Sequence, residues 1–360
     1  MVDKGFWGSR RAFGAAFVAG TALLALAGTA HAEGTIRVLN WQGYGTDEAW
    51  AVELFEQKTG IKVEHDYFNS EQEMLTKLRT SPGTYDVVLI NSSFTGDAAA
   101  EGLIQPIDTS KIGNWGALTP AYRDNAMLNI DGKVMGVAWL WGVTSFAYNT
   151  EKLGAPGSIG ALWDPANAGR VGWRDDAVEA VQLAALATGQ NMNDPADMNV
   201  IREKLRALKG QIATFWSSED EWNKLMSSGA FDLATYWSGS ASRSKTAFGL
   251  PVEFVIPPEG AIGWLDGLSI AAGAPNPDGA HAFIDFMDSA EFYVKWDTEV
   301  GAPASANAEA MAALPEGAFN RVVLGDPAVG ERLQFMAPIP EERRQAYLEL
   351  WQETKTYFAE

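Results

Sequence analysis

The chain has 360 residues, 46 of them acidic and 27 basic, a formal net charge of −19, and no cysteine. This balance argues against nucleic acid and anionic membrane surfaces as partners, because both require basic patches. The lack of cysteine excludes disulfides, zinc-thiolate sites, cysteine nucleophiles and a lipid anchor on cysteine. His65 and His281 lie far apart in the sequence, so we predict neither a metal site nor a cofactor.

Residues 1–32 have the pattern of an export signal. Three basic residues precede an apolar run over 12–27, and Ala30-His31-Ala32 fits a small-x-small cleavage site. The run is short for a membrane span, so we expect a mature protein that begins at Glu33 and acts in the periplasm. Two adjacent arginines leave both the general and the twin-arginine export route open. Removing 1–32 leaves 24 basic and 45 acidic residues, a net charge of −21, which suits a cationic ligand.

The first elements after the signal alternate between strands and helices. We expect strands at 35–40, 61–67 and 86–90, separated by helices at 46–60 and 70–79. The third strand is continuously apolar, as in a parallel sheet covered on both faces, so this βαβαβ order predicts an open α/β sheet.

The rest of the chain continues the mixed pattern. We expect extended segments at 135–148, 231–237, 253–256 and 268–271, and helices at 177–188, 198–208, 219–228, 277–289 and 341–358. The mature length exceeds one typical hydrophobic core, which predicts two lobes.

Several aromatic and polar residues follow expected strands. Trp41 and Tyr44 come after the first strand, Ser92 and Phe94 after the third, and Trp237 ends a later one. Ligands of open α/β sheets bind outside the carboxyl ends of strands, so these side chains are candidates for a binding site. The alternative is that the aromatic rings attach their loops to the core.

Trp264-Leu265-Asp266 places an indole and a carboxylate two residues apart on an expected strand, hence on one face. An organic cation needs this pair, because the carboxylate accepts its N–H donors and the ring attracts its charge. The alternative is that Trp264 belongs to the core and that Asp266 opens a turn before Gly267.

Asp176 and Glu179 form a second acidic pair at an expected helix start. Residues three apart share a helix face, so their carboxylates are placed to clasp an ammonium group. The same spacing fits a capping box, with Asp176 as N-cap and Glu179 at the third helical position. The residues alone leave both interpretations open.

Seven segments, in this order and spacing, resemble a known family: NWQGY at 40–44, TGIKV at 59–63, YDVVLINSSF at 85–94, EGLIQPID at 101–108, RDDAVEA at 174–180, YWSGSA at 236–241 and IGWLDGLSI at 262–270. Over essentially the whole mature sequence, the chain resembles the periplasmic spermidine/putrescine-binding proteins of ABC importers.

The resemblance implies an α/β fold of the two-lobe (type II) periplasmic-binding-protein class, with the ligand between the lobes. The expected lobes are 33–141 with 266–309, and 142–265 with 310–360. Strand crossings near 140–143 and 265–268 would form the hinge. It further implies a monomer that catalyses no reaction, binds a polyamine and docks on a membrane ABC permease.

The resemblance also implies roles for individual residues. The expected ligand-binding residues are Trp41, Tyr44, Trp237 and Trp264 as aromatic walls, Asp176, Glu179 and Asp266 as anionic partners, Phe94 as a stacking ring, and Ser92 and Gln334 as polar contacts. Two positions depart from the family pattern. Phe94 and Ala302 stand where tyrosines are expected, so one wall of the site is either open or filled from elsewhere.

Two other functions are compatible with parts of the sequence. Because Ala302 opens a wall, a receptor of the same fold for another amine, an opine or an amino-acid derivative is one alternative. An exported glycosidase that uses Asp176 and Asp266 as acid and base is the other. The sequence argues against the enzyme, because it offers no histidine or cysteine constellation and no serine with a neighbouring base.

Overall fold

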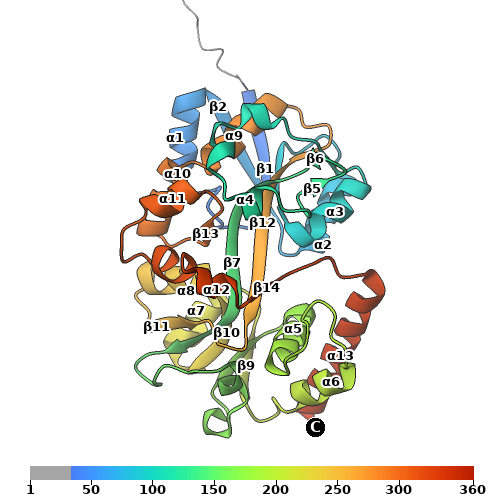
Figure 1. Ribbon diagram of the computed structural model, residues 1–360, viewed down its shortest axis with the longest axis vertical. Coiled ribbons are helices and arrows are strands. Elements are labelled where there is room, and N and C mark those ends of the chain that lie inside the picture. Colours follow the sequence, from blue (N-terminus) through green and yellow to red (C-terminus); the bar gives the residue numbers. More distant parts are fainter. Residues whose placement is uncertain (1–33) are drawn as a thin grey trace, which may run out of the picture. The chain divides into compact units, whose positions relative to one another are not determined.

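The computed structural model describes residues 34–360, so the predicted export signal lies outside the described residues. These residues form one compact unit. Its centre is a mixed sheet with the strand order β2-β1-β3-β12-β7-β10-β8-β9, to which β4, β11, β13 and β14 add (Figure 1). The strands are β1 Gly34–Asn40, β2 Ile61–Tyr67, β3 Val87–Asn91, β4 Ile104–Gln105, β5 Asn129–Ile130, β6 Lys133–Val134, β7 Val137–Asn149, β8 Val171–Arg174, β9 Ile212–Trp216, β10 Leu233–Trp237, β11 Val252–Val255, β12 Ala261–Ala271, β13 Ala304–Ser305 and β14 Leu333–Phe335.

The α-helices pack around this sheet. They are α1 Ala49–Thr59, α2 Glu71–Thr80, α3 Ser92–Ala100, α4 Pro120–Arg123, α5 Ala177–Ala187, α6 Met198–Arg206, α7 Glu219–Ser228, α8 Ser238–Thr246, α9 Pro277–Met287, α10 Ala290–Glu299, α11 Ala308–Ala313, α12 Pro327–Gly330 and α13 Glu341–Ala359. The predicted mixed α/β fold is confirmed. The structure adds α3 and α8, which begin directly at the ends of β3 and β10, and also α4, α10, α11 and α12; the sequence predicted no helix at these places.

Helix caps explain where several predicted helices begin. The Ser70 hydroxyl accepts a hydrogen bond from the Glu73 N–H at 3.1 Å, and Ser218 does the same for Glu221 at 3.2 Å. Helix α1 begins at Ala49, later than predicted, because the Thr46 hydroxyl accepts from the Asn40 amide at 2.8 Å instead of capping the helix.

The antiparallel pair β7 and β12 is the longest feature of the sheet (Figure 1). All 13 residues of β7 are buried. In this pair Trp264 lies opposite Gly142 and Asp266 opposite Leu140, and a bulge follows in which Gly267 lies opposite Ala138. Both predicted crossing segments, 140–143 and 265–268, lie within these two strands.

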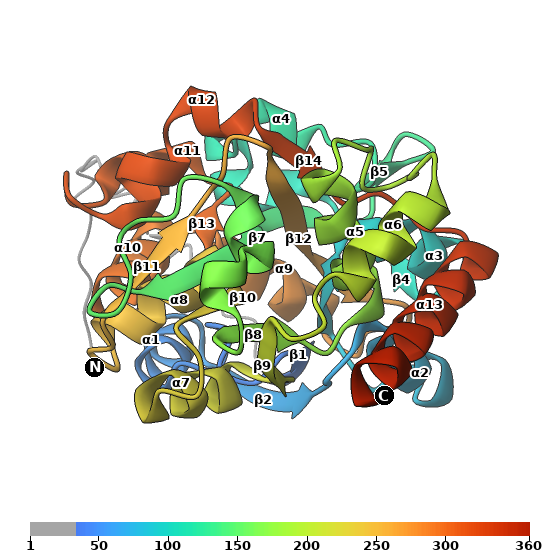
Figure 2. The ribbon, with the colours of Figure 1, turned by 90° about the horizontal axis from the view of Figure 1, so that it is seen from below.

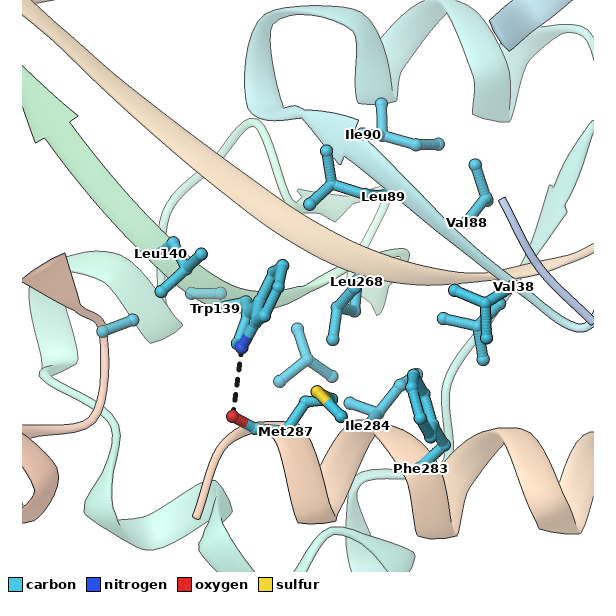
Figure 3. Close-up of a cluster of buried hydrophobic side chains, with 14 of the residues drawn as sticks. Val38, Val88, Leu89, Ile90, Trp139, Leu140, Leu268, Phe283, Ile284 and Met287 are labelled. Carbon is cyan, nitrogen blue, oxygen red and sulfur yellow. Dashed lines mark hydrogen bonds between the residues drawn. The ribbon is translucent and has the colours of Figure 1, made fainter. Parts of the chain in front are cut away.

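One buried cluster joins α9 to β1, β3, β7 and β12. Phe283 and Ile284 of α9 face Val38 and Leu268, and the Trp139 indole N–H donates to the Met287 carbonyl at 3.0 Å (Figure 3). Burial of these apolar side chains favours the fold by about 25 cal/mol for each Å² removed from water. The cluster therefore fixes β3, which ends at Asn91, and β12, which carries Asp266.

A separate cluster lies under α5, α6 and α13 (Figure 2). Helix α13 packs against α5 and α6, and Trp351 of α13 donates from its indole N–H to Asp175 at 2.7 Å. This packing holds the end of β8 and the start of α5 in place. No helix within residues 34–360 is both long and apolar enough to span a membrane.

Candidate ligand-binding site

Asp266 is a buried carboxylate held by two neutral donors. It lies opposite Asn91 in the antiparallel β12–β3 pair, and the Asn91 side-chain amide donates to its Oδ1 at 2.9 Å. The Tyr44 hydroxyl donates to its Oδ2 at 2.9 Å. The residue is 7% exposed, and burial raises its pKa to about 6, against the lowering effect of these two hydrogen bonds. Because Asp266 lies inside β12, the alternative of a turn before Gly267 is wrong.

Tyr44 and Trp41 approach from the loop after β1. The Tyr44 ring meets Trp139 and Trp296 edge to face, at centroid distances of 5.9 and 6.3 Å. Burial, reinforced by the charge of Asp266, raises the pKa of Tyr44, so its hydroxyl stays neutral and donates. Trp41 is half-buried and packs on Phe68 at 4.6 Å. Tyr44 thus reaches Asp266, while Trp41 is attached to the first core cluster.

Gly142 allows the Trp264 indole to lie across β7. A β-carbon at this position would stand 2.3 Å from Cζ2 of Trp264, so only glycine leaves room for the ring. The Trp264 indole N–H is buried and has no hydrogen-bond partner among residues 34–360. The side chain therefore combines a half-buried ring with a buried N–H that no group of the described residues accepts.

Strand register puts three predicted site residues on one face of the sheet. Trp264 and Asp266 lie opposite Gly142 and Leu140 of β7, and Trp237 of β10 lies opposite Thr144. Paired residues share a face, and so do residues two apart on a strand. Trp237, Trp264 and Asp266 therefore point to the same side, as the sequence predicted for the last two.

Asp176 is the N-cap of α5. Its Oδ1 accepts from the Glu179 N–H at 2.9 Å, so the capping interpretation is confirmed for this residue. The Glu179 carboxylate does not complete the predicted capping box. It instead accepts from Nη1 of Arg174, the last residue of β8, at 2.8 Å.

The Arg174 guanidinium occupies the acidic pair. Its Nη1 lies 3.7 Å from Oδ2 of Asp176, and its centre lies 4.7 Å from the Trp237 ring centroid. Burial raises the pKa of Glu179, and the charge of Arg174 opposes that effect. In this structure two of the three predicted anionic partners, Asp176 and Glu179, and the Trp237 wall thus hold a cation that belongs to the chain itself.

Ser92, Phe94 and Gln334 have other surroundings. Ser92 is buried in the first turn of α3. The Phe94 ring lies 5.0 Å from the Arg344 guanidinium of α13. Gln334 accepts from the Met192 N–H at 2.9 Å. These contacts attach Phe94 to α13 and Gln334 to the segment after α5.

The wall expected at Ala302 is filled by α8. Ala302 is fully buried, and a β-carbon on neighbouring Gly301 would stand 2.7 Å from the Arg243 backbone nitrogen. Arg243 donates from Nε to Glu219 at 2.9 Å and from Nη1 to the Gly301 carbonyl at 3.3 Å. The lost tyrosine therefore leaves no opening there.

Two residues of the site were not predicted: Arg174 and Glu71. Glu71 begins α2, and its buried Oε2 has no hydrogen-bond partner within 34–360. Burial and the charge of Asp266 raise the pKa of Glu71 to about 8. The signal that points to Glu71 is its place just after the carboxyl end of β2. The same residues fit a helix start, which explains their pattern without a ligand.

The fold and site define a solute-binding protein, and the chain belongs to the bacterial extracellular solute-binding protein family, whose model matches residues 50–318. The spermidine/putrescine-binding periplasmic protein of Salmonella typhimurium is 34% identical over 260 residues, which cover 70% of this chain and 72% of that protein. Spermidine/putrescine-binding periplasmic protein 1 of Haemophilus influenzae is 32% identical over 84% of this chain and 82% of its own.

Solved structures agree with the fold. A spermidine/putrescine ABC transporter substrate-binding protein from Streptococcus pneumoniae superposes with a TM-score of 0.80 at 24% identity, covering 91% of this chain and 100% of that one. This family consists of binding proteins, which agrees with the prediction of a receptor and removes the glycosidase alternative.

Proposed function

We propose that this chain is a periplasmic receptor that captures a spermidine- or putrescine-like polyamine and delivers it to an ABC importer. The observation that carries the proposal is Asp266, a buried carboxylate that shares one face of the sheet with Trp264 and Trp237. The names of the relatives, which are spermidine/putrescine-binding proteins, support the same ligand class.

The chemistry of Asp266 favours an ammonium ligand. Its two contacts come from neutral groups, Tyr44 and Asn91, so burial of its charge is only partly compensated. An ammonium group would supply the missing counter-charge, and the Trp264 face would attract the same cation. Trp41 would line the methylene chain from the opposite loop. Of the other predicted contacts, Ser92, Phe94 and Gln334 would border the cleft.

Ligand capture would proceed by closure of two lobes about β7 and β12. The predicted lobes are 33–141 with 266–309, and 142–265 with 310–360. The buried side chains of Ala310, Leu314, Leu324 and Val329 belong to the first cluster, which favours moving 310–329 to the first lobe. Ligand shifts such an equilibrium only by contacts it makes better in the closed state. We expect the receptor to act as a monomer.

A ligand panel tests the proposal. Putrescine, spermidine, other amines, opines and neutral sugars would be screened by thermal shift, and hits measured by calorimetry. A ligand that binds only the folded state stabilises it, by about 2.7 kcal/mol at 100 times its Kd. The melting temperature therefore rises. We expect a shift with at least one polyamine. A shift with an opine or amino-acid derivative, and none with any polyamine, would replace the proposed ligand.

A further inference from the structure

We propose that Arg174 is a permanent occupant of one cation position in this site and restricts the receptor to short diamines. The inference rests on the proposed function, because it concerns which polyamine the same site takes. Asp176 and Glu179, expected as anionic partners of the ligand, and Trp237, expected as an aromatic wall, all contact this one guanidinium.

The position of Arg174 is fixed from several sides. Its backbone N–H donates to the Thr235 hydroxyl at 2.9 Å, which ties the end of β8 to β10. Nη1 donates to Glu179, whose side chain is only 7% exposed, and the Arg174 side chain is 25% exposed. A planar guanidinium both pairs with carboxylates and stacks on an indole. Asp176, Glu179 and the Trp237 ring supply both kinds of contact.

Charge complementarity then identifies the ligand class. Asp176, Glu179 and Asp266 are three carboxylates, and Arg174 already compensates one of them. The fourth acid of the site, Glu71, is mainly neutral at pH 7, because burial and Asp266 raise its pKa to about 8. Two negative charges are left for the ligand, which match the two ammonium groups of a diamine. A triamine such as spermidine would bring a third charge toward a guanidinium, where like charges repel.

Calorimetry with putrescine and spermidine tests this on the wild type and on Arg174→Ala. The wild type should prefer putrescine. Removing the guanidinium should free the space between Asp176, Glu179 and Trp237 for an ammonium group. The ratio of the two affinities should then shift toward spermidine by about tenfold or more. A ratio unchanged within a factor of two would overturn the inference, even if both amines still bind.

Two further variants keep the result interpretable. Arg174→Lys retains the charge and should retain the preference for putrescine; a shift toward spermidine equal to that of the alanine variant would contradict the role of charge. Arg170→Ala is the matched control, because Arg170 precedes the same strand and pairs with Asp232. It should leave the ratio unchanged. If Arg174→Ala fails to fold, Arg174→Gln replaces it under the same criteria.

The same calorimetry includes 4-aminobutanoate, which has the length of putrescine but carries a carboxylate in place of one ammonium group. Tighter binding of this compound than of putrescine would mean that Arg174 receives the ligand instead of replacing part of it, and would overturn the inference. If neither amine binds the wild type or any variant, the proposed function itself fails. Amines that bind with an unaltered ratio overturn the inference alone.

Discussion

The two acidic regions of the site contain similar residues but differ in what compensates their charge. Asp266 receives hydrogen bonds from the neutral Tyr44 and Asn91. Glu179 is paired with the cationic Arg174, which also faces Asp176. A carboxylate held by neutral donors still gains from an incoming cation, whereas one paired with a guanidinium gains little. The comparison shows that the number of acids in a cleft does not give the number of cations it binds.

The largest effect should come from Asp266→Asn, which removes the uncompensated charge. Loss of one partner of a buried charged pair costs about 2 kcal/mol or more, so putrescine affinity should fall about 30-fold or more in calorimetry. Asp278→Asn is the control, because Asp278 forms an exposed ion pair with Lys111. Equal affinity of the Asp266 variant and the wild type would remove Asp266 from the site.

The next effect concerns the aromatic wall beside Asp266. In Gly142→Ala the new methyl group overlaps the Trp264 indole, which must move. We expect about 1–3 kcal/mol of lost stability from overpacking and about tenfold weaker amine binding from the displaced ring. Gly96→Ala in α3, where a β-carbon meets open space, should leave amine binding unchanged and raise stability by about 0.5–1 kcal/mol, because alanine favours a helix interior. Wild-type affinity in the Gly142 variant would show that Trp264 does not contact the ligand.

The pH dependence of ligand affinity and of stability should report the charge of Asp266. Only charged Asp266 attracts an ammonium group, so affinity should fall as pH drops through about 6, by up to about tenfold per unit. The raised pKa also means that, without ligand, the contribution of Asp266 to stability is present below pH 3.8 and lost as pH rises through 6. Asp266→Asn should flatten both dependences between pH 4 and 6. Calorimetry and thermal unfolding across this range measure them, and identical profiles for both proteins would contradict this assignment.

The smallest effect comes from the cap of α5. Asp176→Ala and Ser218→Ala each remove one N-cap hydrogen bond, and each should cost about 1 kcal/mol of stability. Only the Asp176 variant should also weaken diamine binding, by a few-fold, since Ser218 caps α7 and serves as the matched control. If the two variants lose affinity equally, Asp176 acts only as a cap.

The sequence predicted the fold where local signals and tertiary structure agree. Apolar runs, the Ser70 cap and the stop at Gly60 located β3, α2 and the end of α1. Helices α3 and α8 were missed because SSFTGDAAA and SGSASRSKT have weak helix propensity. Their first residues are buried against the strands they follow, so tertiary packing determines these helices.

The site was predictable in part for the same reason. Alternation along one strand was enough to put Trp264 and Asp266 on one face. Arg174 was not singled out, because an arginine before two aspartates has the pattern of a solvated surface charge. Its place over Trp237 depends on β8 and β10 being neighbours, a long-range pairing that no local pattern encodes.

A crystal structure of the protein with putrescine tests the central claim most directly. The account predicts an ammonium nitrogen within about 3 Å of an Asp266 carboxylate oxygen, with the Arg174 guanidinium still paired with Glu179. An amine bound away from Asp266, or one that displaces Arg174 from Glu179, would contradict it.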